Sequence, residues 1–149
     1  MRKLIILFVL FIISCSSLDK KIEKNKYVFN LSIGSCFKKD KVLIKLNDTI
    51  LLDNILVTSD EDSGFSNIWM TYYKANKESI MITQLGDKKQ MRKTHFDLNT
   101  LLLEVYRNNQ KNTFYLDLKK GNHIVIDGCD EGYKRKVYIN YYNGVITYE

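Results

Sequence analysis

The chain has 149 residues, of which 45% are hydrophobic and 27% are charged, and its formal charge is +6. This length is that of one domain with enough residues to build a hydrophobic core. Lysines alternate with acidic residues instead of forming the concentrated basic patch that follows a phosphate backbone, so we expect no nucleic-acid partner.

The first fourteen residues have the three-part pattern of a secretory signal. Arg2 and Lys3 give a positive start, residues 4–13 (LIILFVLFII) are apolar without interruption, and the small residue Ser14 precedes Cys15. A helix that crosses a bilayer needs about 20 apolar residues. We therefore expect a cleaved signal peptide over residues 1–14 rather than a permanent transmembrane anchor.

The sequence Ile12-Ile13-Ser14-Cys15 resembles the lipobox of bacterial lipoproteins, which has an aliphatic residue three positions before the cysteine and a small residue directly before it. The resemblance implies that Cys15 becomes the lipidated first residue of the mature chain. A thiolate is a strong nucleophile for alkylation by a diacylglycerol group, and several acyl chains, palmitate among them, anchor a protein stably. The alternative is an ordinary cleaved signal with an incidental cysteine.

The same resemblance implies a location. A lipoprotein is held in the bacterial cell envelope, on the extracytoplasmic side, and its membrane partner is contacted through the lipid on Cys15. Ser16 after the cysteine resembles the sorting signal that permits delivery to the outer membrane in bacteria with two membranes. Residues 15–26 (CSSLDKKIEKNK) are polar and lysine-rich, which is the composition of a tether between membrane and domain.

Cys36 and Cys129 remain as an even pair in a compartment that permits disulfides. We expect them to be bonded to each other, with Cα atoms about 4.4 to 6.8 Å apart. The alternative is two separate buried thiols, since free cysteine behaves as a small apolar residue. We expect no metal site of the zinc type, because the chain has no CxxC spacing and both His95 and His123 stand in isolated strand-like contexts.

From residue 27 onward, short runs rich in Val, Ile, Leu, Tyr, Phe and Thr alternate with Asn, Asp, Gly and Lys clusters, the spacing of an antiparallel all-β domain. We predict a single β-sandwich over residues 27–149, built of about 8 to 11 short strands. The predicted strands are 27–33, 41–46, 49–57, 67–74, 79–84, 92–96, 101–107, 113–118, 123–127, 136–142 and 145–148.

Two stretches resemble recurring pieces of transthyretin-like and immunoglobulin-like bacterial sandwich domains. Residues 41–53 (KVLIKLNDTILLD) are similar to their first hairpin, with the turn at Asn47 and Asp48. Residues 116–126 (LDLKKGNHIVI) are similar to a strand entry in which His123 stands where tyrosine is usual. The resemblance implies the sandwich and no particular activity, because such folds host many unrelated sites.

The sequence Tyr142-Asn143-Gly144-Val145 predicts a C-terminal hairpin with a type I′ turn, which requires positive φ at both Asn143 and Gly144. Alternation along the two strands then divides the side chains between two faces. The core face would carry Val137, Ile139, Tyr141, Ile146 and Tyr148. The outward face would carry Tyr138, Asn140, Tyr142, Val145 and Thr147.

Ten tyrosines and one tryptophan are the main sign of a binding surface. Tyr138 and Tyr142 flank Asn140 on the predicted outward face, and a second predicted strand carries Trp69, Tyr72 and Tyr73. Amphipathic aromatic rings beside amides are what protein-recognition and sugar-stacking surfaces use. The alternative is simple composition, because tyrosine suits a strand on either face.

Catalytic and metal motifs give little support to an enzyme. The acidic loops 59–64 (SDEDSG) and 127–132 (DGCDEG) have carboxylates that suit calcium, but the first lacks the ligand spacing of an EF-hand. No nucleophile elbow, HExxH or paired-glutamate pattern occurs, although His95 precedes an acid at Asp97. We expect no catalytic residues and no cofactor.

These patterns favour a noncatalytic envelope lipoprotein whose β-sandwich binds a protein or a glycan. Two other functions stay open at this point. One is a structural or assembly accessory that adds an edge strand to the sheet of a partner. The other is a small envelope hydrolase whose catalytic groups come from distant positions.

Overall fold

The computed structural model describes residues 26–74, 78–131 and 134–144. The signal segment with Cys15, most of the tether and the predicted last strand at 145–148 lie outside these residues. Within the described ranges, no helix is long and apolar enough to cross a bilayer.

The described residues form strands and connecting loops without helices. The strands are β1 (Lys26–Ile33), β2 (Lys38–Leu46), β3 (Thr49–Thr58), β4 (Ile68–Lys74), β5 (Ser79–Leu85), β6 (Lys88–Lys93), β7 (Leu101–Arg107), β8 (Gln110–Leu116), β9 (His123–Asp127), β10 (Asp130–Glu131), β11 (Lys134–Arg135) and β12 (Tyr138–Tyr142).

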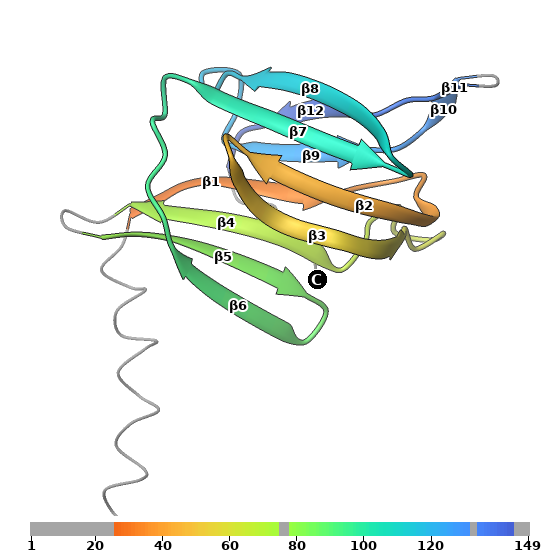
Figure 1. Cartoon of the computed structure of the whole chain (residues 1–149), viewed down its shortest axis with the longest axis horizontal. Coiled ribbons are helices and arrows are strands. Elements are labelled where there is room, and N and C mark those ends of the chain that lie inside the picture. The colour runs from red at the N-terminus through yellow and green to blue at the C-terminus, as the bar shows by residue number, and fades with distance from the viewer. Residues whose placement is uncertain (1–25, 75–77, 132–133, 145–149) are drawn as a thin grey trace, which may run out of the picture.

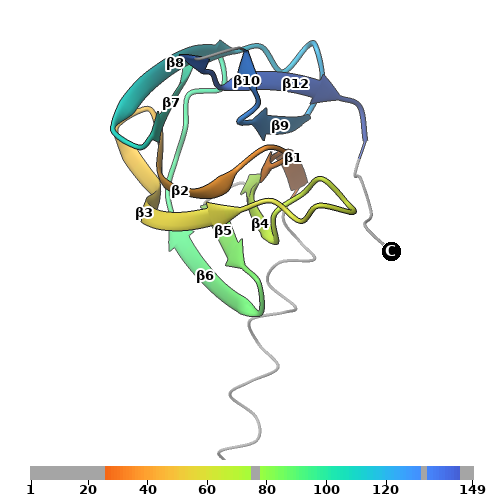
Figure 2. The same ribbon diagram turned by 90° about the vertical axis from the view of Figure 1, so that its right-hand side faces the viewer.

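Ten of these strands form two sheets that pack face to face, which confirms the predicted all-β sandwich (Figures 1 and 2). The larger sheet has six strands in the order β12-β9-β1-β4-β5-β6, and the smaller has four in the order β3-β2-β7-β8. The two shortest strands, β10 and β11, pair with each other in a separate small ribbon. This ribbon was not predicted, because two-residue strands leave no periodic pattern in a sequence.

One pair of strands corrects the expectation of a purely antiparallel sandwich. β1 runs parallel to β9, with Asn30 opposite His123 and Ile33 opposite Ile126. Parallel neighbours need a long crossover connection, and here the crossover includes every strand from β2 to β8. The first strand of the domain is therefore a central strand of the larger sheet, with β4 on its other side.

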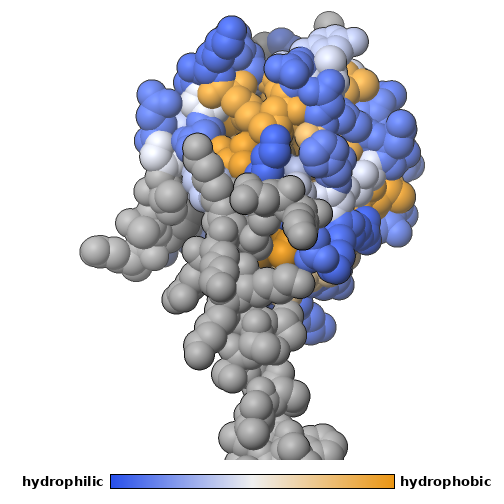
Figure 3. Space-filling model, turned by 90° about the vertical axis from the view of Figure 1, so that its left-hand side faces the viewer, coloured by the Kyte–Doolittle hydropathy of each residue, from blue (hydrophilic) through white to orange (hydrophobic). Residues whose placement is uncertain are grey.

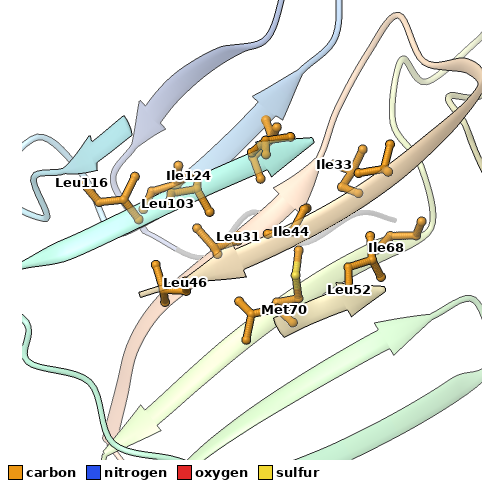
Figure 4. Close-up of a cluster of buried hydrophobic side chains, with 14 of the residues drawn as sticks. Leu31, Ile33, Ile44, Leu46, Leu52, Ile68, Met70, Leu103, Leu116 and Ile124 are labelled. Carbon is orange, nitrogen blue, oxygen red and sulfur yellow. The ribbon is translucent and has the colours of Figure 1, made fainter. Parts of the chain in front are cut away.

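The hydrophobic core lies between the two sheets and follows from strict alternation along the strands. In β2 the residues that point inward are every second one, and β7 repeats the same pattern of burial. Figure 4 shows the inward side chains of both sheets meeting in one apolar layer. Its labelled members are Leu31, Ile33, Ile44, Leu46, Leu52, Ile68, Met70, Leu103, Leu116 and Ile124.

The β2–β3 hairpin has its turn at Asn47 and Asp48, as the sequence predicted. Leu46 pairs with Thr49 across this turn, and Asn47 takes a positive φ of 42°. Asparagine tolerates this left-handed conformation better than most residues. The side-chain oxygen of Asn47 also accepts a hydrogen bond of 2.7 Å from the backbone N–H of Leu102, which fastens the turn to the start of β7.

The predicted strand 92–96 is wrong. The sixth strand is Lys88–Lys93, joined to β5 by the turn at Gly86 and Asp87, and all six of its residues are exposed. Phe96 suggested a strand because it is apolar, but it is buried in the core from the loop that follows β6. An exposed lysine-rich strand lacks the apolar alternation on which the prediction depended.

The type I′ turn at Asn143-Gly144 is also wrong. Such a turn needs positive φ at both residues, whereas only Gly144 has one, at 93°. In the described residues β12 pairs with β9, and the proposed partner strand 145–148 lies outside them. The alternation itself holds on β12, because Ile139 and Tyr141 pack against the core while Asn140 and Tyr142 are exposed.

The predicted disulfide between Cys36 and Cys129 is confirmed. The Cα atoms lie 4.7 Å apart, and the bond joins residues 93 positions apart in the chain. Cys36 belongs to the loop between β1 and β2, and Cys129 follows β9. The disulfide thus closes one end of the sandwich, which we call the disulfide end.

A buried ion pair lies beneath the disulfide. Nη2 of Arg107 is 2.8 Å from Oδ2 of Asp40, and the two side chains are only 3% and 2% exposed. Arg107 also donates hydrogen bonds to the carbonyl oxygens of Cys36, at 3.3 Å, and of Gly128. The carboxylate of Asp40 accepts further hydrogen bonds from the Lys38 backbone and the Asn108 side chain.

The ionised form of Asp40 is favoured by this arrangement. Burial acts to raise the pKa of Asp40, but the hydrogen bonds and the charge of Arg107, with the hydrogen bonds from Lys38 and Asn108, outweigh it and lower the pKa below its usual value. The guanidinium also lies over the ring of Phe37, 5.4 Å from its centroid. Arg107, from the four-stranded sheet, is therefore held against both cysteine-bearing loops.

Candidate binding surface

The register of the larger sheet assembles a continuous outer face on the side away from the core. Successive pairings place six residues in one row across all six strands. The row is Tyr142, His123, Asn30, Thr71, Ile82 and Met91. The predicted binding residues Tyr138, Asn140 and Tyr142 come from β12 and stand at one margin of this face.

Asp127 fixes the position of Asn140. One carboxylate oxygen of Asp127 accepts a hydrogen bond of 2.7 Å from the Asn140 amide nitrogen. The other accepts hydrogen bonds from the backbone N–H and the hydroxyl of Ser35, at 2.7 and 2.9 Å. One side chain thereby joins β12 to the loop that carries the disulfide, and it presents Asn140 in a defined orientation.

Close contact between β9 and this loop requires a glycine at position 34. A Cβ atom at Gly34 would meet the side-chain oxygen Oδ1 of Asp127 and would lie 2.6 Å from Cγ1 of Val125. The absence of a side chain at position 34 lets the loop approach Asp127 closely enough for both hydrogen bonds to Ser35. The orientation of Asn140 depends in this way on the backbone of a distant loop.

Tyr142 is supported from beneath by His123. The two rings meet edge to face, with centroids 6.4 Å apart and planes inclined by 73°. Tyr142 is 46% exposed, whereas His123 is fully buried. A large ring that is held by a buried neighbour loses little conformational freedom when it binds a partner.

His123 takes part in a buried polar chain. Its Nε2 lies 3.1 Å from the Ser32 hydroxyl, and its Nδ1 lies 3.5 Å from the amide nitrogen of Asn30. The Asn30 oxygen in turn accepts a hydrogen bond from the Thr71 hydroxyl. With the Asn30 amide nitrogen directed at Nδ1, a neutral His123 that accepts this hydrogen bond has its proton on Nε2, toward Ser32.

Burial weakens the case for a serine hydrolase at Ser32. Ser32 and His123 are almost completely buried, with exposures of 2% and 0%. The pair instead joins β1 to β9 beneath the outer face.

Burial lowers the pKa of His123 below its usual value. The neutral imidazole is therefore the form that the folded domain holds near pH 7. The second histidine, His95, is exposed in the loop after β6. The acid near it, Asp97, is hydrogen-bonded to Asn99 and Thr100, and those hydrogen bonds lower the pKa of Asp97.

The second aromatic group is divided between the two faces of the sheet. The Ser32–Trp69 and Tyr27–Tyr73 pairings place Trp69 and Tyr73 on the outer face, in the same sheet as Tyr138, Asn140 and Tyr142. Tyr72 points inward and is fully buried. Its hydroxyl accepts a hydrogen bond from the backbone of Phe96, so it is a core residue and no part of a binding surface.

A groove opens at the disulfide end, with a volume of about 480 Å³. Its lining comes from the loops 35–39 and 58–64, with Phe37 as the aromatic wall and with Lys38, Lys39, Asp60 and Glu61 contributing charges. The carboxylate of Asp60 is occupied by hydrogen bonds from Ser63 and Asp62, which lower the pKa of Asp60. Among the described residues, no group of three or more His, Cys, Asp or Glu side chains is arranged to hold a metal ion.

Sequence reasoning missed the residues that organise this region. Asp40 and Arg107 fall on the inward positions of β2 and β7 by simple alternation, which is the signal that would have found them. Asp127 lies on the outward positions of β9, where it alternates with Val125 and His123. The contact between His123 and Ser32 was not accessible to this reasoning, because it depends on the parallel pairing of β1 with β9.

No protein-family model matches this chain, and no curated protein and no solved structure matches it. The geometry of the fold and of its surfaces is therefore the basis for the functional proposal.

We predict that stability falls on mild acidification because of His123. The histidine pKa is about 6.5 in the unfolded chain and lower in the fold, so the unfolded state takes up the proton first. The free energy of unfolding should decline as the pH falls below about 6.5, by up to about 1.4 kcal/mol per pH unit until the folded pKa is reached. Urea titrations between pH 8 and pH 5 measure this slope.

The variant His123→Gln should have a flatter slope in that range, while His95→Gln, at an exposed position, should keep the slope of the wild type. Equal slopes for wild type and His123→Gln would contradict the assignment. The carboxylates with lowered pKa lose their contribution only at lower pH.

Proposed function

We propose that this chain is a lipid-anchored protein of the bacterial cell envelope and that its β-sandwich is a noncatalytic module that binds a protein or glycan partner. The observation that carries the binding proposal is the support given to Tyr142 and Asn140. Tyr142 is exposed yet held by the buried ring of His123, and Asn140 is exposed yet fixed by Asp127. Tyrosine is among the side chains that contribute most to recognition, and holding a side chain in its bound orientation lowers the entropic cost of binding.

The proposed binding surface consists of Tyr138, Asn140 and Tyr142. They project from one face of the edge strand β12, on which Asn140 and Tyr142 are exposed and Tyr138 is half-buried. The hydrogen-bonding capacity of Asn140 beside two tyrosines suits the polar edges of a glycan or a peptide backbone.

The alternative of an assembly accessory has less support. The exposed edge strand β6 carries Lys88, Lys89, Arg92 and Lys93, and positive charges on an edge discourage pairing with another sheet. The edge strand β3 is interrupted by irregular pairing at three points along β2. The edge strand β8 pairs with β7 in a regular register over seven residues, so it is the edge at which strand addition would have to act.

The anchoring part of the proposal predicts that the full chain becomes labelled by a palmitate analogue in the cells that make it. Cys15→Ala should abolish the labelling and delay removal of the signal, because the thiol is the group that is alkylated. The double variant Cys36→Ala/Cys129→Ala should keep the label. Labelling that survives Cys15→Ala would show that this residue is not the lipidation site.

The binding part predicts that Tyr142→Ala weakens partner binding by about 5-fold to 150-fold, corresponding to about 1 to 3 kcal/mol. The full tagged chain would be recovered from its own envelope, and retained proteins and glycan fragments would be quantified by mass spectrometry. The matched control is Tyr115→Ala, since Tyr115 is 81% exposed on β8 of the opposite sheet.

The same species should be retained by wild type and by Tyr115→Ala and lost from Tyr142→Ala at unchanged thermal stability. Equal retention by all three would remove the β12 surface from consideration. A large loss of stability in Tyr142→Ala would show that the ring is part of the fold rather than a contact for a partner.

A further inference from the structure

Sheet edges define a partner more closely than surface composition does. Apolar and hydrophilic side chains lie side by side at the end of the molecule that Figure 3 shows, and such a mixture selects no single ligand. An edge strand instead presents backbone N–H and C=O groups that another strand pairs in register. The two sheets have four such edges, which are β12, β6, β3 and β8.

Three of these edges carry a feature that discourages pairing with another strand. β6 has four exposed cations. On β3 the carbonyl oxygen of Ile50 is occupied by a hydrogen bond of 2.7 Å from the side chain of Arg92, in the other sheet. β12 has only five residues, and it ends against the loop at Gly121, where a Cβ would lie 2.5 Å from the carbonyl oxygen of Tyr142. The remaining edge is β8.

The β7–β8 hairpin determines which backbone groups β8 offers. Its two-residue loop, 108–109, has positive φ at both positions, 49° and 68°, as in a type I′ turn. Such a turn is closed by a hydrogen bond from the N–H of Gln110 to the carbonyl oxygen of Arg107, which are paired in the register. Hydrogen-bonded pairs with β7 therefore fall on Gln110 and on every second residue after it.

The residues between them, Lys111, Thr113 and Tyr115, point their backbone N–H and C=O groups away from β7. β8 is the last strand in its sheet, so no strand of the described residues lies on that side (Figure 1). The seven pairs with β7 contain no irregularity. All three side chains are exposed, that of Tyr115 to 81%. β8 thus offers a regular ladder to one further strand.

The one cation of β8 is compensated within its own sheet. Lys111 forms an ion pair with Glu104 of β7 and lies over the ring of Tyr106, 5.7 Å from its centroid. Positive charges protect an edge because an added strand would bury them or place them opposite like charges. Since Glu104 compensates Lys111, this protection is weak at β8.

The sequence of β8 is complementary to itself in the antiparallel direction. When Thr113 lies opposite its own copy, all seven residues of β8 are paired, and Lys111 lies opposite the second copy's Tyr115. Two threonines, or a lysine and a tyrosine, are favourable cross-strand neighbours, and no like charges are opposed. We infer that β8 is a self-association surface, at which two copies of this chain pair antiparallel and form a symmetric dimer.

This pairing sets the arrangement of the two domains. The two-fold axis passes between the two copies of Thr113, perpendicular to the sheet, and the interface is closed to further copies. The smaller sheets join into one sheet of eight strands, four from each copy. Both larger sheets then lie on the same side of it, and the two outer faces with Asn140 and Tyr142 point in one direction. A partner with repeated units would be bound at two points, which raises the overall affinity.

Self-association at β8 does not depend on the proposed function, because β12 belongs to the other sheet and is no part of this ladder. Tyr115→Ala removes a side chain from the β8 edge and leaves the β12 surface as it is. It therefore stays a control for partner binding at β12.

The test uses the full chain in a mild nonionic detergent, with its mass measured by sedimentation equilibrium over a range of concentrations. We expect the mass of one chain at low concentration and of two chains at high concentration. Amide hydrogen exchange, measured for each residue by NMR, should slow in the dimer by about tenfold or more at Lys111, Thr113 and Tyr115. Asn112 and Phe114, which are hydrogen-bonded to β7 in both states, should change little.

Thr113→Lys places two positive charges opposite each other and should weaken the dimer by about fivefold. Thr113→Glu should do the same with two negative charges. A mixture of the two variants should form a mixed dimer, because lysine then lies opposite glutamate. The control Gln90→Lys adds the same positive charge at an exposed position of β6 and should dimerise as the wild type does. Thermal unfolding confirms that each variant is folded.

Thr113→Pro should abolish the dimer, because it removes the central N–H donor from both copies. The hairpin tolerates proline there, since β7 does not use the N–H of Thr113 and proline is accepted on edge strands at such positions. If Thr113→Pro nevertheless fails to fold, the mixed dimer of Thr113→Lys and Thr113→Glu decides.

Three results would overturn the inference. One is a chain that is monomeric at every concentration. Another is a dimer that Thr113→Lys and Thr113→Glu leave unchanged. The third is an equal slowing of exchange at Thr113 and Phe114, which would indicate contact through a face of the sheet instead of its edge. None of these results bears on the β12 surface, which Tyr142→Ala tests.

Discussion

The ion pair between Asp40 and Arg107 is the contact on which the disulfide end of this domain depends. A buried charge without its partner is strongly destabilising, so each of the two residues requires the other. Arg107 extends from the smaller sheet and donates hydrogen bonds to the carbonyls of Cys36 and Gly128, which belong to loops on either side of the disulfide. The pair thus holds both cysteines in place from beneath, and the covalent bond closes above it.

The binding surface is linked to the same region. The loop that begins with Gly34 and carries Ser35 and Cys36 is hydrogen-bonded to Asp127, and Asp127 holds Asn140 on the outer face. A change beneath the disulfide would move this loop and with it the amide that we assign to partner binding. Tyr142 depends on a different support, the buried polar chain through His123 and Ser32. Two networks therefore position the outward residues of β12. Asp127 holds Asn140, and His123 supports Tyr142.

Local patterns in the sequence predicted most of the strands and the disulfide, because alternation and turn residues act over a few positions. They predicted the outward position of Asn140 and Tyr142 for the same reason, even though the turn type at Asn143-Gly144 was wrong. The parallel pairing of β1 with β9 could not be predicted locally, since its two strands are separated by almost the whole domain. Arg107 is different. Alternation places it inward, although a charged residue at a strand end is ordinarily exposed. Its burial is explained by its partner Asp40 and by the carbonyl oxygens of Cys36 and Gly128.

The most direct test of this account is a double-mutant cycle on the buried pair, measured by urea unfolding with the disulfide intact. Arg107→Leu and Asp40→Leu should each lower the free energy of unfolding by about 3 to 5 kcal/mol, and the double variant should lose far less than their sum. The exposed pair Lys93–Glu78 is the control, with an expected coupling below about 1 kcal/mol. Additive losses at Asp40 and Arg107, or single losses no larger than those of the exposed pair, would contradict the central role of this contact.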